Sequence, residues 1–66
     1  MSEKEKILAV VSDEIDTYEH MVATEMRRIK EQSDPALVAI EAEAMSKYNH
    51  ALKVLKELKK KMEEAQ

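Results

Sequence analysis

The stretch Ser33-Asp34-Pro35-Ala36-Leu37 lies at the middle of this 66-residue chain and divides it into two halves. Asp34 is a favourable N-cap residue, and Pro35 suits the first position of a helix, where its missing N–H costs nothing. The chain has no other proline and no glycine, so nothing else in the sequence is a strong helix breaker. The sequence therefore predicts one turn, at residues 32–34, between two long helices.

Outward from this turn, both halves favour helix to their ends. Ser2 and Glu5 fit a capping box, in which each side chain satisfies a backbone N–H near the other residue. We therefore expect one domain spanning residues 1–66, with helices over about 3–31 and 35–64. Each helix would be roughly 45 Å long at 1.5 Å per residue. A connection of this length makes the two helices antiparallel neighbours.

The apolar residues of both halves recur at alternating spacings of three and four, which is typical of a helix that packs along another helix. In an antiparallel hairpin, facing residues have numbers with a nearly constant sum. Six layers satisfy that rule: Leu8/Leu58, Val11/Leu55, Ile15/Ala51, Tyr18/Tyr48, Val22/Ala44 and Ile29/Leu37. The sequence thus predicts an all-α, coiled-coil-like antiparallel two-helix hairpin.

More apolar residues flank these layers than a two-helix hairpin can bury. Exposed apolar surface of this extent costs about 25 cal/mol per Å² and usually marks an interface. We therefore expect dimerisation into a four-helix bundle, or association with another helical protein. The residues expected at that interface are Ile7, Val10, Met21, Met26, Val38, Met45, Leu52 and Val54.

Composition argues against several other classes of protein. There is no cysteine for a disulfide, and no apolar run of the roughly 18–20 residues that span a bilayer. Net charge is −3, with acidic and basic residues interspersed, whereas nucleic-acid binding needs a concentrated basic face. The one basic cluster, within residues 56–61, reads as a solvated helix end. We expect a soluble, cytoplasmic protein with no membrane contact and no nucleic acid as its main partner.

The sequence also offers few groups suited to catalysis. It has no cysteine nucleophile and no glycine-rich phosphate loop, so we expect neither an enzyme nor a bound cofactor. His20 lies four residues after Asp16, and His50 four after Ser46; both histidines read as surface residues, with half of a metal site as the alternative for His20.

Glu25 and Glu41 fall within one layer of the expected seam and face each other. Carboxylates in a helical core occur in di-iron bundles, which combine them with Glu-x-x-His motifs. Here Arg28 and Ala44 occupy the histidine positions. We therefore expect a polar layer that fixes register, with Arg28, Lys47 or a partner's cation beside it; a carboxylate metal site is the alternative.

The turn and second helix resemble the helical hairpin of type III secretion needle subunits. The resemblance rests on Ser33-Asp34-Pro35-Ala36-Leu37 with Ala39, then on Ser46, Tyr48 and Asn49, and, after a seven-residue gap, on Leu52-Lys53-Val54-Leu55-Lys56. It covers about half of the chain. It implies a hairpin that assembles with copies of itself, or a small helical hairpin that accompanies such a system as a chaperone.

Taken together, these observations favour a non-enzymatic protein that works by helix–helix association, as a homodimeric bundle, an adaptor or a small chaperone of a helical partner. Three alternatives remain open from the sequence. They are a needle-like subunit or needle chaperone, a carboxylate metalloprotein, and an RNA-binding hairpin dimer.

Overall fold

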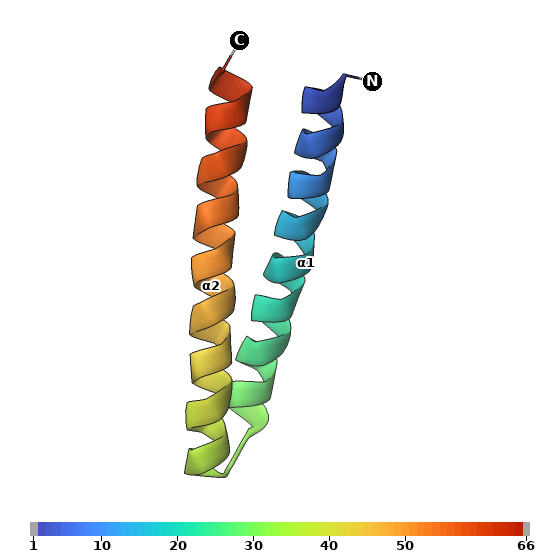
Figure 1. Cartoon of the computed structure of the whole chain (residues 1–66). Coiled ribbons are helices and arrows are strands. Elements are labelled where there is room, and N and C mark those ends of the chain that lie inside the picture. The colour runs from blue at the N-terminus through green and yellow to red at the C-terminus, as the bar shows by residue number, and fades with distance from the viewer. Residues whose placement is uncertain (1, 66) are drawn as a thin grey trace.

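The computed structural model describes residues 2–65 and consists of two helices packed side by side (Figure 1). Helix α1 comprises Glu3–Glu31 and helix α2 comprises Pro35–Glu64, the bounds expected from the sequence. The helices run in opposite directions, so the first turn of α1 and the last turn of α2 lie together at the open end of the hairpin. The molecule is long and narrow, measuring 49 × 16 × 12 Å. The prediction of an all-α antiparallel hairpin is confirmed.

Both helices begin with the caps that the sequence predicts. The hydroxyl of Ser2 accepts a hydrogen bond from the backbone N–H of Glu5 at 3.1 Å. At the second helix, the carboxylate of Asp34 accepts one from the N–H of Ala36 at 2.9 Å, and Pro35 follows Asp34 at the start of the helix. These bonds satisfy N–H groups that have no acceptor within the helix itself.

The turn contains a further contact that the sequence analysis did not predict. The side-chain oxygen of Gln32 accepts hydrogen bonds from the N–H groups of both Ser33 and Asp34, each at 3.2 Å. The N–H of Gln32 in turn donates to the carbonyl of Ile29 at 3.3 Å. One glutamine therefore closes the end of α1 and holds the residues that lead into α2.

The helices pack along a seam, defined here as the buried or half-buried residues through which each helix meets the other. On α1 the seam contains Leu8, Val11, Ile15, Tyr18, Val22, Glu25 and Ile29; on α2 it contains Val38, Glu41, Met45, Tyr48, Leu52, Leu55, Lys59 and Met62. Within residues 2–65, three apolar residues are more than nine-tenths buried: Val11, Ile15 and Leu52. Tyr18, Val22 and Leu55 pack against them.

The expected tyrosine layer is present. The ring centroids of Tyr18 and Tyr48 are 6.0 Å apart, with the ring planes inclined at 49°. This tilted arrangement is one that aromatic pairs favour, because the edge of one ring meets the face of the other. The contact lies midway along the hairpin and confirms the predicted register at that level.

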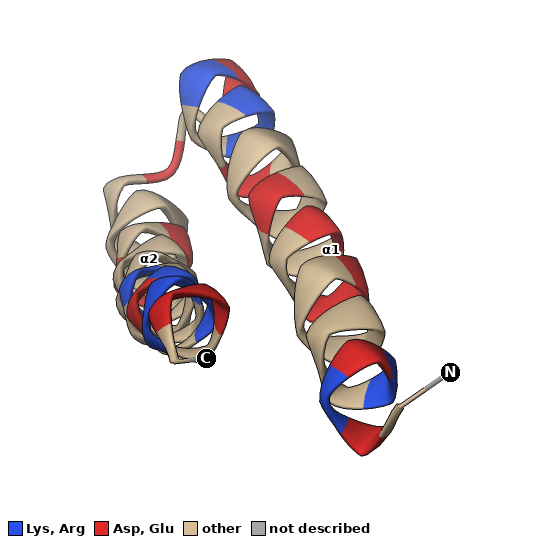
Figure 2. Cartoon of the chain, turned by 90° about the horizontal axis from the view of Figure 1, so that it is seen from above, with Lys and Arg blue, Asp and Glu red and all other residues tan. Residues whose placement is uncertain are grey.

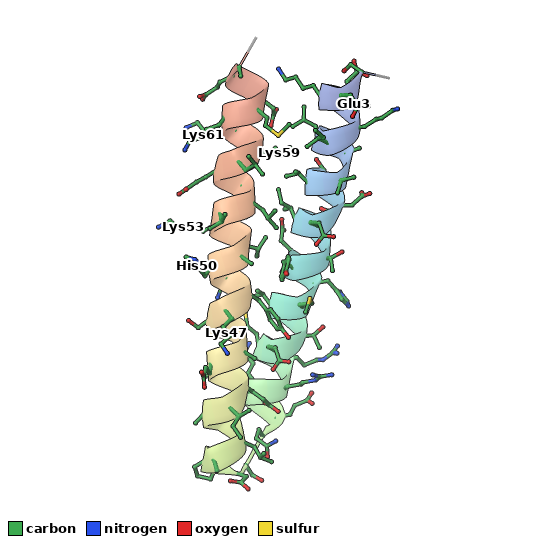
Figure 3. The ribbon with its side chains drawn as sticks, viewed as in Figure 1. Glu3, Lys47, His50, Lys53, Lys59 and Lys61 are labelled. Atoms are coloured by element: carbon green, nitrogen blue, oxygen red, sulfur yellow. The ribbon has the colours of Figure 1, made fainter. Side chains whose placement is uncertain are left out.

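On α2 the predicted seam is wrong by one residue at several layers. Leu37 and Leu58, expected to face α1, are 44% and 43% exposed, whereas Leu52, expected on the outer surface, is 8% exposed. At these layers the next residue in sequence turns toward α1 instead, and Figure 3 shows one of them, Lys59, lying between the helices. Bulky residues such as Leu52 bury more apolar area against α1 than alanine does, which favours this rotation.

The two helices differ in how their charges are distributed. Figure 2 shows Lys and Arg at the two ends of α1 with only Asp and Glu between them, whereas α2 carries residues of both signs. Over residues 2–65, neither helix is apolar enough along its length to cross a membrane.

Candidate interaction face

Large apolar side chains in exposed positions gather on one side of the hairpin. Within residues 2–65, seven such side chains are between 43% and 63% exposed. Six of them share one position relative to the seam and are called the apolar face here: Ile7, Val10, Leu37, Ile40, Val54 and Leu58. The seventh is Met26.

Each residue of the apolar face comes immediately before a residue of the seam. Ile7 precedes Leu8 on α1, for example, and Val54 precedes Leu55 on α2. A side chain one position earlier in the sequence is rotated by about 100° around the helix axis, in the same sense with respect to the chain direction on both helices. Because the helices are antiparallel and their seams face each other, that rotation directs both sets of side chains to the same side of the hairpin. Met26 follows the seam residue Glu25 and therefore lies on the opposite side.

Two surface hollows support the placement of both sets of side chains on the same side of the hairpin, because Tyr48 borders both hollows. The first, of about 250 Å³, is lined on α1 by residues that also come one position before a seam residue, including Met21 and Thr24. The second, of about 350 Å³, is lined on α2 by Ile40 and Ala44. The Tyr48 side chain thus lies between the stripes of the two helices, which share one side of the hairpin.

The residues expected at an interface divide into three groups in the structure. Ile7, Val10 and Val54 lie on the apolar face, with Met21 half-buried at its edge. Val38, Met45 and Leu52 instead belong to the seam, so they pack against α1 within the hairpin. Met26 lies on the side of the hairpin opposite the apolar face.

Sequence reasoning missed Leu37 and Leu58 as surface residues because it assigned them to the seam. Ile40, the most exposed of the seven at 63%, was likewise not among the residues expected at the interface. Two adjacent stripes on α2 fit the helical spacing. At the two middle layers the bulkier residue packs against α1, Met45 rather than Ala44 and Leu52 rather than Ala51. At the ends the opposite holds, because Leu37 and Leu58 remain at the surface, so residue size alone would not have identified them.

The opposite side of the hairpin is polar. It contains an open hollow of about 560 Å³ toward the open end, lined mainly by charged residues: Ser12, Ile15, Asp16, Glu19, Lys56, Lys59, Lys60, Glu63 and Glu64. Within it, the ammonium group of Lys56 lies 3.9 Å from the carboxylate of Glu19. At the open end, the ammonium group of Lys4 donates a hydrogen bond to the carbonyl of Ala65. Acidic and basic groups alternate here, so this surface lacks the single sign of charge that phosphate binding requires.

The polar layer of Glu25 and Glu41 is present in the seam. Glu25 is 7% exposed and pairs with Arg28, whose guanidinium lies 3.1 Å from one carboxylate oxygen. The other oxygen of Glu25 and one oxygen of Glu41 are buried with no hydrogen-bond partner among the described residues. Lys47, the other expected partner, instead lies 3.8 Å from Glu43. The hairpin therefore contains two carboxylates that are only partly satisfied.

The histidines lie outside the seam. His20 borders the hollow that contains Glu25 and Arg28, and both histidines are exposed; Figure 3 shows His50 directed away from α1. In the part of the chain that the structure describes, no group of three or more His, Asp or Glu side chains is arranged to hold a metal ion.

The arrangement therefore offers exposed apolar side chains on one side of the hairpin as a surface for packing. Comparison with known proteins adds no relative: no family model, no curated protein and no solved structure matches this chain.

Proposed function

We propose that this chain is a helix–helix association module that binds one or more amphipathic helices through its apolar face and carries out no catalysis. The observation that carries this proposal is the placement of six of the seven exposed large apolar side chains on one side of the hairpin. Scattered apolar residues are ordinary on a protein surface, but a contiguous apolar surface bordered by charge is typical of an interaction site.

The small core of the hairpin supports the same conclusion. Among the residues that the structure describes, three apolar side chains are more than nine-tenths buried, and none is completely enclosed. A chain of this size buries only about 60% of its unfolded surface and is marginally stable by itself. Covering the apolar face would add the burial that the hairpin lacks, at roughly 25 cal/mol per Å².

The apolar face favours a helix as its ligand rather than an extended strand or a small molecule. Its residues follow the three-and-four spacing of an amphipathic helix surface, as Ile7 and Val10 show on α1 and Leu37 and Ile40 on α2. Grooves between such side chains accept the ridges of another helix. A needle-like subunit or a needle chaperone would be a special case of this proposal, because both act by helix packing.

Site-specific photo-crosslinking in cells that express the protein tests the proposal. A photoreactive amino acid at Val54 lies on the apolar face, and the same probe at Lys53 lies on the polar side of the same helix turn. We expect the Val54 probe to give covalent adducts of discrete mass that mass spectrometry assigns to a helical protein, including this chain itself, and the Lys53 probe to give none. Equal labelling from the two positions, or no adduct from either, would overturn the proposal.

A further inference from the structure

We propose that the ligand of the apolar face is a second copy of this chain, with the two α2 helices antiparallel across a two-fold axis near Lys47. The inference rests on the proposed function and names its partner. In a two-fold dimer the same surface is used by both chains, so that surface must be complementary to itself. The exposed stripe of α2 meets this condition.

That stripe reads nearly the same in both directions along the helix. Starting from the turn, its residues are Leu37, Ile40, Ala44, Lys47, Ala51, Val54 and Leu58. When two such stripes run antiparallel and centre on Lys47, Leu37 of one chain lies opposite Leu58 of the other. In the same alignment, Ile40 lies opposite Val54 and Ala44 opposite Ala51. Every layer on either side of Lys47 therefore joins residues of the same class.

The shape of the stripe also favours a second helix. Ala44 and Ala51 are half-buried, so the stripe is lower on either side of Lys47 than at its leucine ends. The hollow of about 350 Å³ beside Ala44 and Lys47 lies in this central region. Small residues allow two helix backbones to approach closely, while the larger side chains at both ends fill the space where the helices diverge.

Charges along the stripe are compatible with this alignment. Lys47 is near the axis, and its ammonium group lies 3.8 Å from Glu43 of its own helix, which offsets its repulsion from Lys47 of the other chain. Toward either end, Lys61 comes level with Asp34 of the other chain. Opposite charges across an interface help to fix its register. The alignment therefore places one repulsive contact at the centre and an attractive one at each end.

The exposed area of the hairpin matches what a dimer needs. Its accessible surface is 5096 Å² for a mass of 7.6 kDa, whereas a folded monomer of that mass typically exposes about 4,300 Å². The excess of about 800 Å² equals the share that one partner buries in a protein–protein interface of ordinary size. A second copy on the apolar face would remove this excess from both chains.

Cysteine cross-linking of the purified chain tests the alignment directly. The chain contains no cysteine, so a single substitution introduces the only thiol. In the proposed dimer, Lys47→Cys brings two thiols together at the axis, whereas Lys53→Cys, the matched control, places them on the polar sides. We expect a rapid, nearly complete disulfide-linked dimer from Lys47→Cys at micromolar concentration, and only slow linkage from Lys53→Cys. Equal rates at the two positions would overturn the alignment.

A second measurement does not depend on disulfide formation. Lys47→Leu replaces the repulsion at the axis with an apolar contact, so we expect the dissociation constant of the dimer to fall on the order of tenfold. Lys53→Leu should leave that constant unchanged. Light scattering of the wild-type chain should give a dimer. A monomer at several hundred micromolar, or an assembly larger than a dimer, would overturn the inference, whereas the proposed function would still stand if the Val54 probe captured another helical protein in cells.

Discussion

Leu52 and Leu58 are the same residue type on the same helix, yet the structure gives them opposite environments. Leu52 is 8% exposed within the core and Leu58 is 43% exposed on the apolar face. We expect Leu52→Ala to lower the free energy of unfolding by about 2–5 kcal/mol at any protein concentration, because it leaves a cavity in the hairpin. Circular dichroism melts at two concentrations, tenfold or more apart, measure this effect.

Leu58→Ala is the matched control for that substitution. It removes the same atoms from a position that, in the proposed dimer, contacts the second chain. We expect the melting temperature of this variant to depend less on protein concentration than that of the wild type, and the dilute protein to be nearly unaffected. If Leu58→Ala destabilised dilute protein as much as Leu52→Ala, the assignment of the two leucines would be wrong.

Substitution of Glu25 and Glu41 tests whether the polar layer stabilises the hairpin. Each has one buried carboxylate oxygen without a partner among the described residues. We expect the double substitution Glu25→Leu/Glu41→Leu to raise the free energy of unfolding by about 1–4 kcal/mol, because apolar side chains commonly outperform buried charges. Arg28 would lose its partner but is 60% exposed at its side chain and remains hydrated. A thermal melt compares the two proteins.

The same variant separates a structural layer from a metal site. A bound divalent ion would raise the melting temperature of the wild type, a chelator would lower it, and the leucine pair would abolish both effects. We expect no response to either reagent. Glu57→Leu, at an exposed position of α2, controls for the general effect of removing an acidic group. A chelator-sensitive melt confined to the wild type would indicate a metalloprotein.

At the scale of the helices, the bounds of α1 and α2 were predictable because the signals that set them are local. Asp34 and Pro35 start α2 by their own chemistry, and the chain contains no glycine that would end a helix early. The rotation of α2 was not predictable in this way. Ala51 and Leu52 both fit the three-and-four spacing, and the choice between them depends on how well each packs against Val11 and Ile15 of the other helix.

The turn offers a prediction about the connection between the helices. Insertion of four glycines between Ser33 and Asp34 keeps the Asp34 cap on Ala36 and roughly doubles the length of the loop. We expect a loss of about 1 kcal/mol or less, because the entropy of loop closure rises slowly with length. Asp34→Ala should cost a similar amount, about 1 kcal/mol, through the lost cap. Denaturant titration measures both variants.

A contrary outcome of the glycine insertion would be informative. If it abolished the helical signal, or converted the protein into a species of different mass, the turn would be more than a passive connection. In that case the hydrogen bonds of Gln32 with the N–H groups of Ser33 and Asp34 would be essential to the hairpin. Gln32→Ala without any insertion would then reproduce the loss.

At the scale of the whole molecule, self-association predicts that stability depends on concentration. We expect the melting temperature of the wild type to rise as the protein is concentrated, since binding of a second chain stabilises the folded state by mass action. Ile40→Glu/Val54→Glu should remove this dependence and give a monomer, because it places charge on the apolar face. Asn49→Glu/Lys53→Glu, on the polar side, should leave it unchanged. Concentration-independent melting of the wild-type chain would contradict the prediction.

The distribution of buried contacts along the seam has a consequence for the rate at which the chain folds. Contacts near the turn close the shortest loops and so form first, but that part of the seam contains the partly satisfied carboxylates of Glu25 and Glu41. The best-buried cluster, formed by Val11, Ile15 and Leu52, joins residues that are distant in sequence. We therefore expect the contacts that form first to stabilise the chain little. The folding transition state should form only when Val11, Ile15 and Leu52 come together. Replacing both glutamates with leucine should accordingly speed folding more than it slows unfolding.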